Sequence, residues 1–173
     1  MNQSSVPRRY GVVSVAEQAI LGGLEFVQGL ASGSLPLNSM ARTLGYDIVE
    51  ASVGRVVVTA LANADHLNPA GSVHGGLAAT LLDSCMGLAV WSAIAKGFGS
   101  TTLEFKISFV RPITPDAGQI TAEGAKATAP VWKVQASDEL ADAVTLSSGG
   151  SPRLVRRLQR MPSNRIAVVL ATK

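Results

Sequence analysis

The stretch SVHGGLAATLLDSCMGLAVW, residues 72–91, places one acid, Asp83, inside a run of small and apolar side chains. A run of this composition and length is typical of a buried helix of about five turns. An unpaired carboxylate in such a core would cost several kcal/mol or would bind a proton. We therefore expect Asp83 either to belong to a functional site or to be held by a nearby hydroxyl such as Thr80 or Ser84.

Two adjacent glycines, Gly75 and Gly76, stand at the start of this run. Glycine lets a ligand approach the backbone closely, and the first N–H groups of a helix have no partner within the helix. These groups also lie at the positive end of the helix dipole, where an oxygen that gains negative charge is stabilised. The pair indicates an anion-stabilising site, although it could instead allow tight packing.

The segments around the helix predict antiparallel strands. Residues 44–62 contain two β-prone runs that flank a turn at Val53 and Gly54, which predicts a hairpin. Apolar and polar residues then alternate over 103–109, and further strands are predicted over 118–127 and 131–137. Strands that wrap around one long apolar helix make an α+β domain of two layers.

The chain is predicted to have three parts. Ser14 and Glu17 have capping-box spacing ahead of a helical apolar repeat, which predicts one extra helix in an N-terminal extension, residues 1–34. Residues 35–150 form the main domain, and residues 151–173 form a basic tail of uncertain structure. The tail contains six basic residues and no acid, so it could contact nucleic acid, but only weakly and without sequence specificity.

Composition excludes several classes of protein. A chain of 173 residues with 47% hydrophobic residues can bury a core as a single domain. Its one cysteine excludes an intramolecular disulfide framework and suits a reducing compartment, so we expect a cytoplasmic protein. The N-terminus does not have the pattern of a signal peptide, and Asp83 interrupts the one run that approaches a membrane span. No membrane association is expected.

Metal and thiol chemistry are also not expected. His66, His74 and Asp65 lie close in sequence, but they lack the spacing of metal ligands on a helix. Cys85 follows Asp83 by two residues and therefore faces another side of the helix. We expect Cys85 to be a buried small side chain, and no metal or cofactor to be required.

Two stretches carry a resemblance to a known family. From His66 to Asp83 the sequence reads H-x-N-x-x-G-x-x-H-G-G, then six residues and an aspartate, and TTLEFKISFVRPITPDAG follows over 101–118. Over about residues 35–125 the chain resembles hotdog-fold acyl-CoA thioesterases of the phenylacetate-degradation type. The resemblance implies a hotdog fold, in which an antiparallel sheet wraps a long central helix. It also implies hydrolysis of an acyl- or aryl-CoA thioester.

The resemblance implies a role for five residues. Asn68 matches the asparagine that contacts the thioester carbonyl or the attacking water, and Gly75 matches the glycine whose N–H is the oxyanion donor. Asp83 matches the catalytic carboxylate, which acts as nucleophile or general base. Thr101 falls where the family has a serine or threonine that positions the water or the carboxylate, and His74 is a supporting residue of the motif.

The spacing of two of these residues adds a geometric constraint. Eight residues of helix rise about 12 Å, so Gly75 and Asp83 of one chain cannot both contact one carbonyl carbon. A symmetric dimer would bring Gly75 of one copy to Asp83 of the other. The resemblance likewise implies a homodimer or homotetramer with the active site at the subunit interface.

Two other functions fit the same fold. The chain could be a noncatalytic module that binds acyl-CoA or contacts nucleic acid through its tail. It could also be a hotdog dehydratase that pairs the helix acid with His74. After about residue 125 the alternating strands that complete the sheet in the family are poorly matched, so either a shifted reading frame or a divergent extension is expected there.

Overall fold

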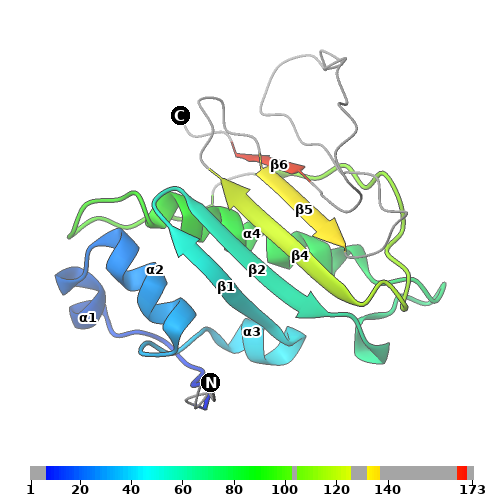
Figure 1. Ribbon diagram of the computed structural model, residues 1–173, viewed down its shortest axis with the longest axis horizontal. Helices are drawn as coiled ribbons and strands as arrows, with labels where there is room; N and C mark the ends of the chain where they lie inside the picture. Colours follow the sequence, from blue (N-terminus) through cyan, green and yellow to red (C-terminus); the bar gives the residue numbers. More distant parts are fainter. Residues whose placement is uncertain (1–6, 103–104, 126–131, 137–166, 171–173) are drawn as a thin grey trace, which may run out of the picture.

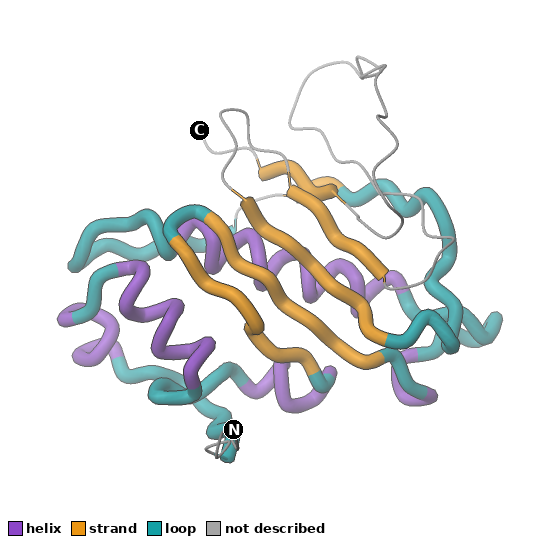
Figure 2. The backbone as a smooth tube through the Cα atoms, in the orientation of Figure 1, coloured by secondary structure: helices purple, strands orange, loops and turns teal. Residues whose placement is uncertain are grey.

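One long helix, α4, lies across one face of an antiparallel sheet (Figures 1 and 2). The computed structural model describes residues 7–102, 105–125, 132–136 and 167–170. In this part of the chain the sheet has six strands in the order β1-β2-β4-β5-β6-β3, and all neighbouring pairs are antiparallel. The bounds are α4 Gly75–Trp91, β1 Tyr46–Ser52, β2 Arg55–Leu61, β3 Phe105–Lys106, β4 Gln119–Ala125, β5 Trp132–Ala136 and β6 Ala167–Leu170. The predicted α+β class is confirmed.

The predicted hairpin is present as β1 and β2. Tyr46 pairs with Ala60 at one end, and Ser52 pairs with Arg55 at the turn. Gly54 adopts a left-handed φ of 72°, which side chains with a Cβ rarely adopt, so this glycine permits the tight turn.

The core lies between α4 and the central strands β2 and β4. Alternate residues of each strand face the helix, so each strand contributes one apolar face. The buried side chains of this interface are Leu77, Leu81, Leu82, Cys85, Met86 and Ala89 of α4, with Val56, Val58, Ile120 and Ala122 from the strands. The backbones of β4 and α4 meet directly at Gly124, where a Cβ would lie 2.3 Å from the carbonyl oxygen of Cys85.

The N-terminal extension contains two short helices where one was predicted. They are α1, Val15–Ile20, and α2, Gly23–Ser32, and the predicted capping box of Ser14 and Glu17 opens α1. The prediction of a single helix was wrong, because Leu21 and Gly22 adopt extended backbone conformations and separate the two helices. A third helix, α3, spans Ser39–Leu44.

Helix α2 packs against the end of α4 and beside β1 (Figure 1). The rings of Phe26 and Trp91 stack with their centroids 4.9 Å apart. A Cβ on Gly23 would lie 1.9 Å from the carbonyl oxygen of Trp91, so this close approach requires glycine. The extension therefore supports the C-terminal end of α4.

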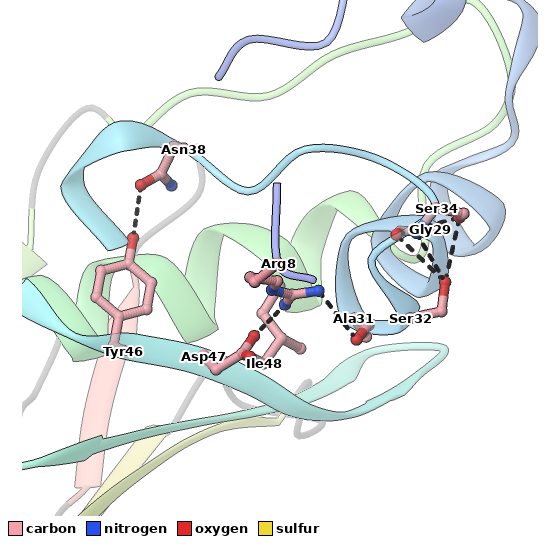
Figure 3. A network of polar contacts seen from close by, with 9 residues as sticks. All are labelled: Arg8, Gly29, Ala31, Ser32, Ser34, Asn38, Tyr46, Asp47 and Ile48. Atoms are coloured by element: carbon pink, nitrogen blue, oxygen red, sulfur yellow. Dashed lines mark hydrogen bonds and ion pairs between the residues drawn. The ribbon is translucent and has the colours of Figure 1, made fainter. Parts of the chain in front are cut away.

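The segment before α1 is tied to the same region (Figure 3). Arg8 forms an ion pair with Asp47 of β1 and donates a hydrogen bond to the carbonyl oxygen of Ala31, 3.3 Å away. Tyr46 donates to Asn38, which caps α3. These contacts connect the chain start, two helices and the edge strand.

The strand predicted over 103–109 is shorter than expected. Within the described residues only Phe105 and Lys106 are in strand β3, and residues 107–110 lie outside it. A strand needs a partner as well as an alternating pattern. Among the described residues, β3 makes two pairs with β6, Phe105 with Leu170 and Lys106 with Val169. The strands predicted over 118–127 and 131–137 are present as β4 and β5.

The basic tail contributes β6, Ala167–Leu170, which lies between β5 and β3. Its five arginines lie outside the described residues, as do the C-terminal lysine and most of the region where the family resemblance ends. Among the described helices, none is both long enough and apolar enough to cross a membrane.

We predict that Gly124→Ala lowers the free energy of unfolding by about 3 kcal/mol, because the new Cβ meets the α4 backbone, which cannot yield as a side-chain tip can. Gly87→Ala is the matched control, because a Cβ at that position in α4 meets no atom within 4 Å. Alanine is favoured over glycine inside a helix by about 0.8–1.0 kcal/mol, so the control should be stabilised. Urea unfolding of both variants measures the difference, and equal stabilities would contradict the close approach.

Candidate functional site

The first group of candidate residues lies at the N-terminal end of α4. His74 is the N-cap, and its Nδ1 accepts a hydrogen bond from the N–H of Gly76, 2.8 Å away. The next N–H, that of Leu77, donates to the carbonyl oxygen of His74 at 3.0 Å. Within the described residues the N–H of Gly75 makes no hydrogen bond. The helix therefore begins with one free donor at the positive end of its dipole.

Asn68 lies in the loop before this helix and is held by the loop itself. Its Oδ1 accepts from the N–H groups of Ala70 and Ser72, at 2.9 and 3.2 Å, and its Nδ2 donates to the hydroxyl of Ser72 at 2.8 Å. The loop is joined to the helix start because His74 N–H donates to the carbonyl oxygen of His66 at 2.7 Å. An amide nitrogen carries two hydrogens, so Nδ2 keeps one donor for another group.

Asp83 lies about two turns further along α4 and is half-buried. Its Oδ1 accepts a hydrogen bond from the hydroxyl of Thr102, 2.7 Å away. The two nearer hydroxyls have other partners, because Thr80 donates to the carbonyl oxygen of Gly76 and Ser84 donates to Tyr46. The polar partner that Asp83 required is therefore supplied from the segment after the helix.

The hydroxyl that contacts Asp83 comes from the neighbour of a predicted site residue. The resemblance implied that Thr101 positions the water or the carboxylate; Thr101 is exposed, and Thr102 makes the contact with the carboxylate. Two adjacent threonines give a sequence pattern in which either can face the helix, and residues 103–104 beyond them lie outside the described part. A role for Thr101 in positioning water stays a prediction.

The chain after α4 returns along the helix towards its start. Thr102 contacts Asp83, Phe109 lies against Gly75, and Ile113 accepts a hydrogen bond from the N–H of Val73 at 2.9 Å. We call residues 102 and 105–113 the return segment. The sequence did not predict that Phe109 lies at Gly75, because its place in an alternating run indicates only a strand residue.

Asp83 and the residues at the helix start are not brought together within one chain. Gly75, His74 and Asn68 lie at the start of α4, whereas Asp83 is eight residues along the helix from Gly75. Eight residues of α-helix span about 12 Å. A single thioester carbonyl could contact one group or the other in this chain, but not both.

The remaining candidates for chemistry are structural. Cys85 is buried, its Sγ donates to the carbonyl oxygen of Leu82 at 3.2 Å, and burial raises the pKa of its thiol well above the ordinary value. The predicted buried cysteine is confirmed. His66 is buried and its Nδ1 accepts from the N–H of Asn63 at 3.2 Å. The described residues contain no cluster of three histidine, cysteine, aspartate or glutamate side chains that could bind a metal ion.

Comparisons with known proteins agree with this architecture. Residues 70–127 match the thioesterase superfamily. A solved structure from Ralstonia eutropha JMP134, described as a phenylacetic acid degradation-related protein and provisionally as a thioesterase, is 23% identical, with a TM-score of 0.54 over 83% of this chain and 96% of that one. The chain has a hotdog fold. S. sahachiroi AziG is 18% identical, with a TM-score of 0.50 over 75% of this chain and 91% of that one.

A curated relative matches a shorter segment. A Halobacterium salinarum protein, provisionally named an esterase, is 46% identical over 48 residues, which are 27% of this chain and 32% of that protein. The chain therefore spans about a third of that relative. The predicted resemblance to hotdog-fold thioesterases of the phenylacetate-degradation type is confirmed. The superfamily match contains Gly75, Asp83 and the return segment, whereas Asn68 lies just before it.

Proposed function

We propose that this protein is an acyl-CoA thioesterase that hydrolyses an acyl- or aryl-CoA to the free acid and CoA, at a site shared by two copies of the chain. One observation carries the proposal. A helix N-terminal donor at Gly75, which has no partner in the described part of the chain, and a half-buried carboxylate at Asp83 stand on the same helix, within the segment that matches the thioesterase superfamily. These are the two groups that thioester hydrolysis requires.

The Gly75 N–H stabilises the charge that develops during the reaction. The carbonyl oxygen of the thioester accepts this hydrogen bond, and the interaction strengthens when that oxygen becomes an oxyanion. His74 supports the donor by accepting from the N–H of Gly76, which leaves Gly75 as the group facing the substrate. The remaining hydrogen of Asn68 Nδ2 is suited to orient the carbonyl or the attacking water.

Asp83 supplies the base or the nucleophile. As a base, it takes a proton from water while the water oxygen bonds to the carbonyl carbon; the tetrahedral intermediate then breaks its C–S bond, and the CoA sulfur leaves and is protonated. As a nucleophile, Asp83 itself bonds to the carbonyl carbon and expels the CoA sulfur, and water then hydrolyses the mixed anhydride. In both routes the hydroxyl of Thr102 orients the carboxylate.

Two copies of the chain satisfy the spacing along α4. In a symmetric dimer, Gly75 of one copy and Asp83 of the other face one carbonyl, and symmetry produces two equivalent sites. Asp83 lies on the same side of α4 as Gly76 and Thr80, and these residues are exposed or half-exposed, so a second chain can approach there. Pairs of dimers could assemble further into tetramers, and a cytoplasmic location fits an acyl-CoA substrate.

The proposal predicts thiol release from a panel of short, medium, long and aromatic acyl-CoAs. Asp83→Asn should lose at least about a hundredfold in kcat, because an amide accepts the Thr102 hydrogen bond but cannot act as a base or as an effective nucleophile. Substrate affinity should change by only a fewfold. A thiol reagent measures the released CoA, and equilibrium binding measures the affinity.

The same panel separates the proposed enzyme from a noncatalytic module. Binding of acyl-CoA without thiol release from any member would favour a module that only binds. Full turnover by a folded Asp83→Asn variant would remove this carboxylate from the mechanism.

The oxyanion donor can be tested by removing one N–H. We predict that Gly75→Pro lowers kcat by about 10²- to 10³-fold, the loss typical of one oxyanion donor. Proline is favoured at the first position of a helix, and the residue before it, His74, already has the extended ψ of 131° that proline requires. The variant should therefore fold.

Gly75→Ala is the matched control because it keeps the N–H. Both substitutions add a Cβ, which would lie 2.9 Å from Cζ at the tip of the half-exposed Phe109 ring, so both displace the ring. The difference in kcat between the two variants reports the replacement of the N–H hydrogen by the proline Cδ. Equal kcat values would contradict the assignment of the Gly75 N–H.

A further inference from the structure

The ring of Phe109 covers the backbone of Gly75. A Cβ built on Gly75 would lie 2.9 Å from Cζ of Phe109, 3.1 Å from Cε1 and 3.4 Å from Cε2, so the end of the ring occupies the space where a side chain would begin. Phe109 nevertheless remains 57% exposed. One part of the ring therefore packs on the helix start, and the rest faces outward.

The position of the ring is set by the return segment. Thr102 anchors this segment to Asp83, and Ile113 anchors it to Val73 just before the helix. Phe109 lies between these anchors, so its contact with Gly75 follows from the path of the backbone. An aromatic ring is rigid apart from two torsions, which makes it a defined wall.

We infer that Phe109 selects the acyl group by forming the wall beside the reacting carbonyl. This inference rests on the proposed function, because it takes the Gly75 N–H as the donor to the carbonyl oxygen. The donor and the Cα under the ring belong to the same residue, so a carbonyl bound at hydrogen-bond distance places the first carbons of its acyl chain next to the ring. The outward part of Phe109 then becomes covered by substrate.

The geometry favours straight acyl chains. A wall beside the carbonyl leaves space for a chain that leads away from it but crowds a second substituent on the carbon next to the carbonyl. A single methyl or methylene group in an apolar site changes kcat/KM by roughly 10- to 200-fold. Butanoyl-CoA and 2-methylpropanoyl-CoA have the same number of carbons and differ only in branching. The ratio of their kcat/KM values therefore isolates the effect of the wall.

The test compares this ratio among variants. Wild-type protein should prefer butanoyl-CoA, and Phe109→Ala should shift the ratio of the two kcat/KM values towards the branched substrate by at least about tenfold. Phe109→Leu, which keeps apolar bulk without the ring, should give an intermediate ratio. Phe98→Ala is the control: Phe98 is 73% exposed, follows the C-terminal end of α4, and should leave the ratio unchanged.

A second substitution tests the contact itself. In wild-type protein Gly75→Ala should move the ratio in the same direction, because its Cβ displaces the ring. In the Phe109→Ala background the effect of Gly75→Ala on the ratio should differ from its effect in wild-type protein, because no ring remains to displace. Independent effects of the two substitutions would contradict the contact.

The outcomes distinguish this inference from the proposed function. Absence of thiol release by wild-type protein across the acyl-CoA panel would overturn the proposed function, and the selectivity role with it. If wild-type protein turns over the substrates but the ratio of kcat/KM values in Phe109→Ala stays within twofold of the wild-type ratio, only the role of Phe109 is overturned. A structural role of Phe109 would lower both kcat/KM values equally, so it would also leave the ratio unchanged. If Phe109→Ala fails to fold, Phe109→Leu decides by the same criterion.

Discussion

The direct contact between the backbones of β4 and α4 at Gly124 is the constraint on which the candidate site depends. No side chain separates the strand from the carbonyl of Cys85, so the helix is held at a fixed depth against the sheet. Asp83 lies two residues before this contact and Gly75 begins the same helix. The sheet therefore positions both functional groups through one rigid element, and their separation of about 12 Å cannot close within a chain.

A rigid separation has a chemical consequence. The carboxylate of Asp83 stays half-exposed and accepts a hydrogen bond from Thr102, so this polar group has a partner on a helix rich in apolar side chains. Among the described residues the N–H of Gly75 has no partner for a different reason, because the first N–H groups of any helix lack partners within it. With a second copy of the chain, the Gly75 N–H of one copy and the Asp83 carboxylate of the other can face the same thioester carbonyl. Association of two chains is then part of the proposed catalysis.

Much of this architecture could be predicted from local patterns, and the differences have physical causes. The long helix and the β1–β2 hairpin were predicted because their periodicity and turn residues are local properties. The split of the N-terminal helix depends on the backbone conformation at Gly22. The shortening of the strand predicted over 103–109 depends on its pairing with a partner strand. The contacts of Thr102 and Phe109 depend on the path of the return segment along α4, which no periodicity reveals.

The shared site is tested most directly by mixing two inactive variants. Gly75→Pro and Asp83→Asn chains are unfolded together and refolded in equal amounts, so that about half of the dimers are mixed if pairing is random. Each mixed dimer then has one site with both lesions and one site with neither. The account predicts recovery of about a quarter of wild-type activity if the sites act independently. No recovery, in a preparation shown by mass spectrometry to contain mixed dimers, would contradict a site shared between two chains.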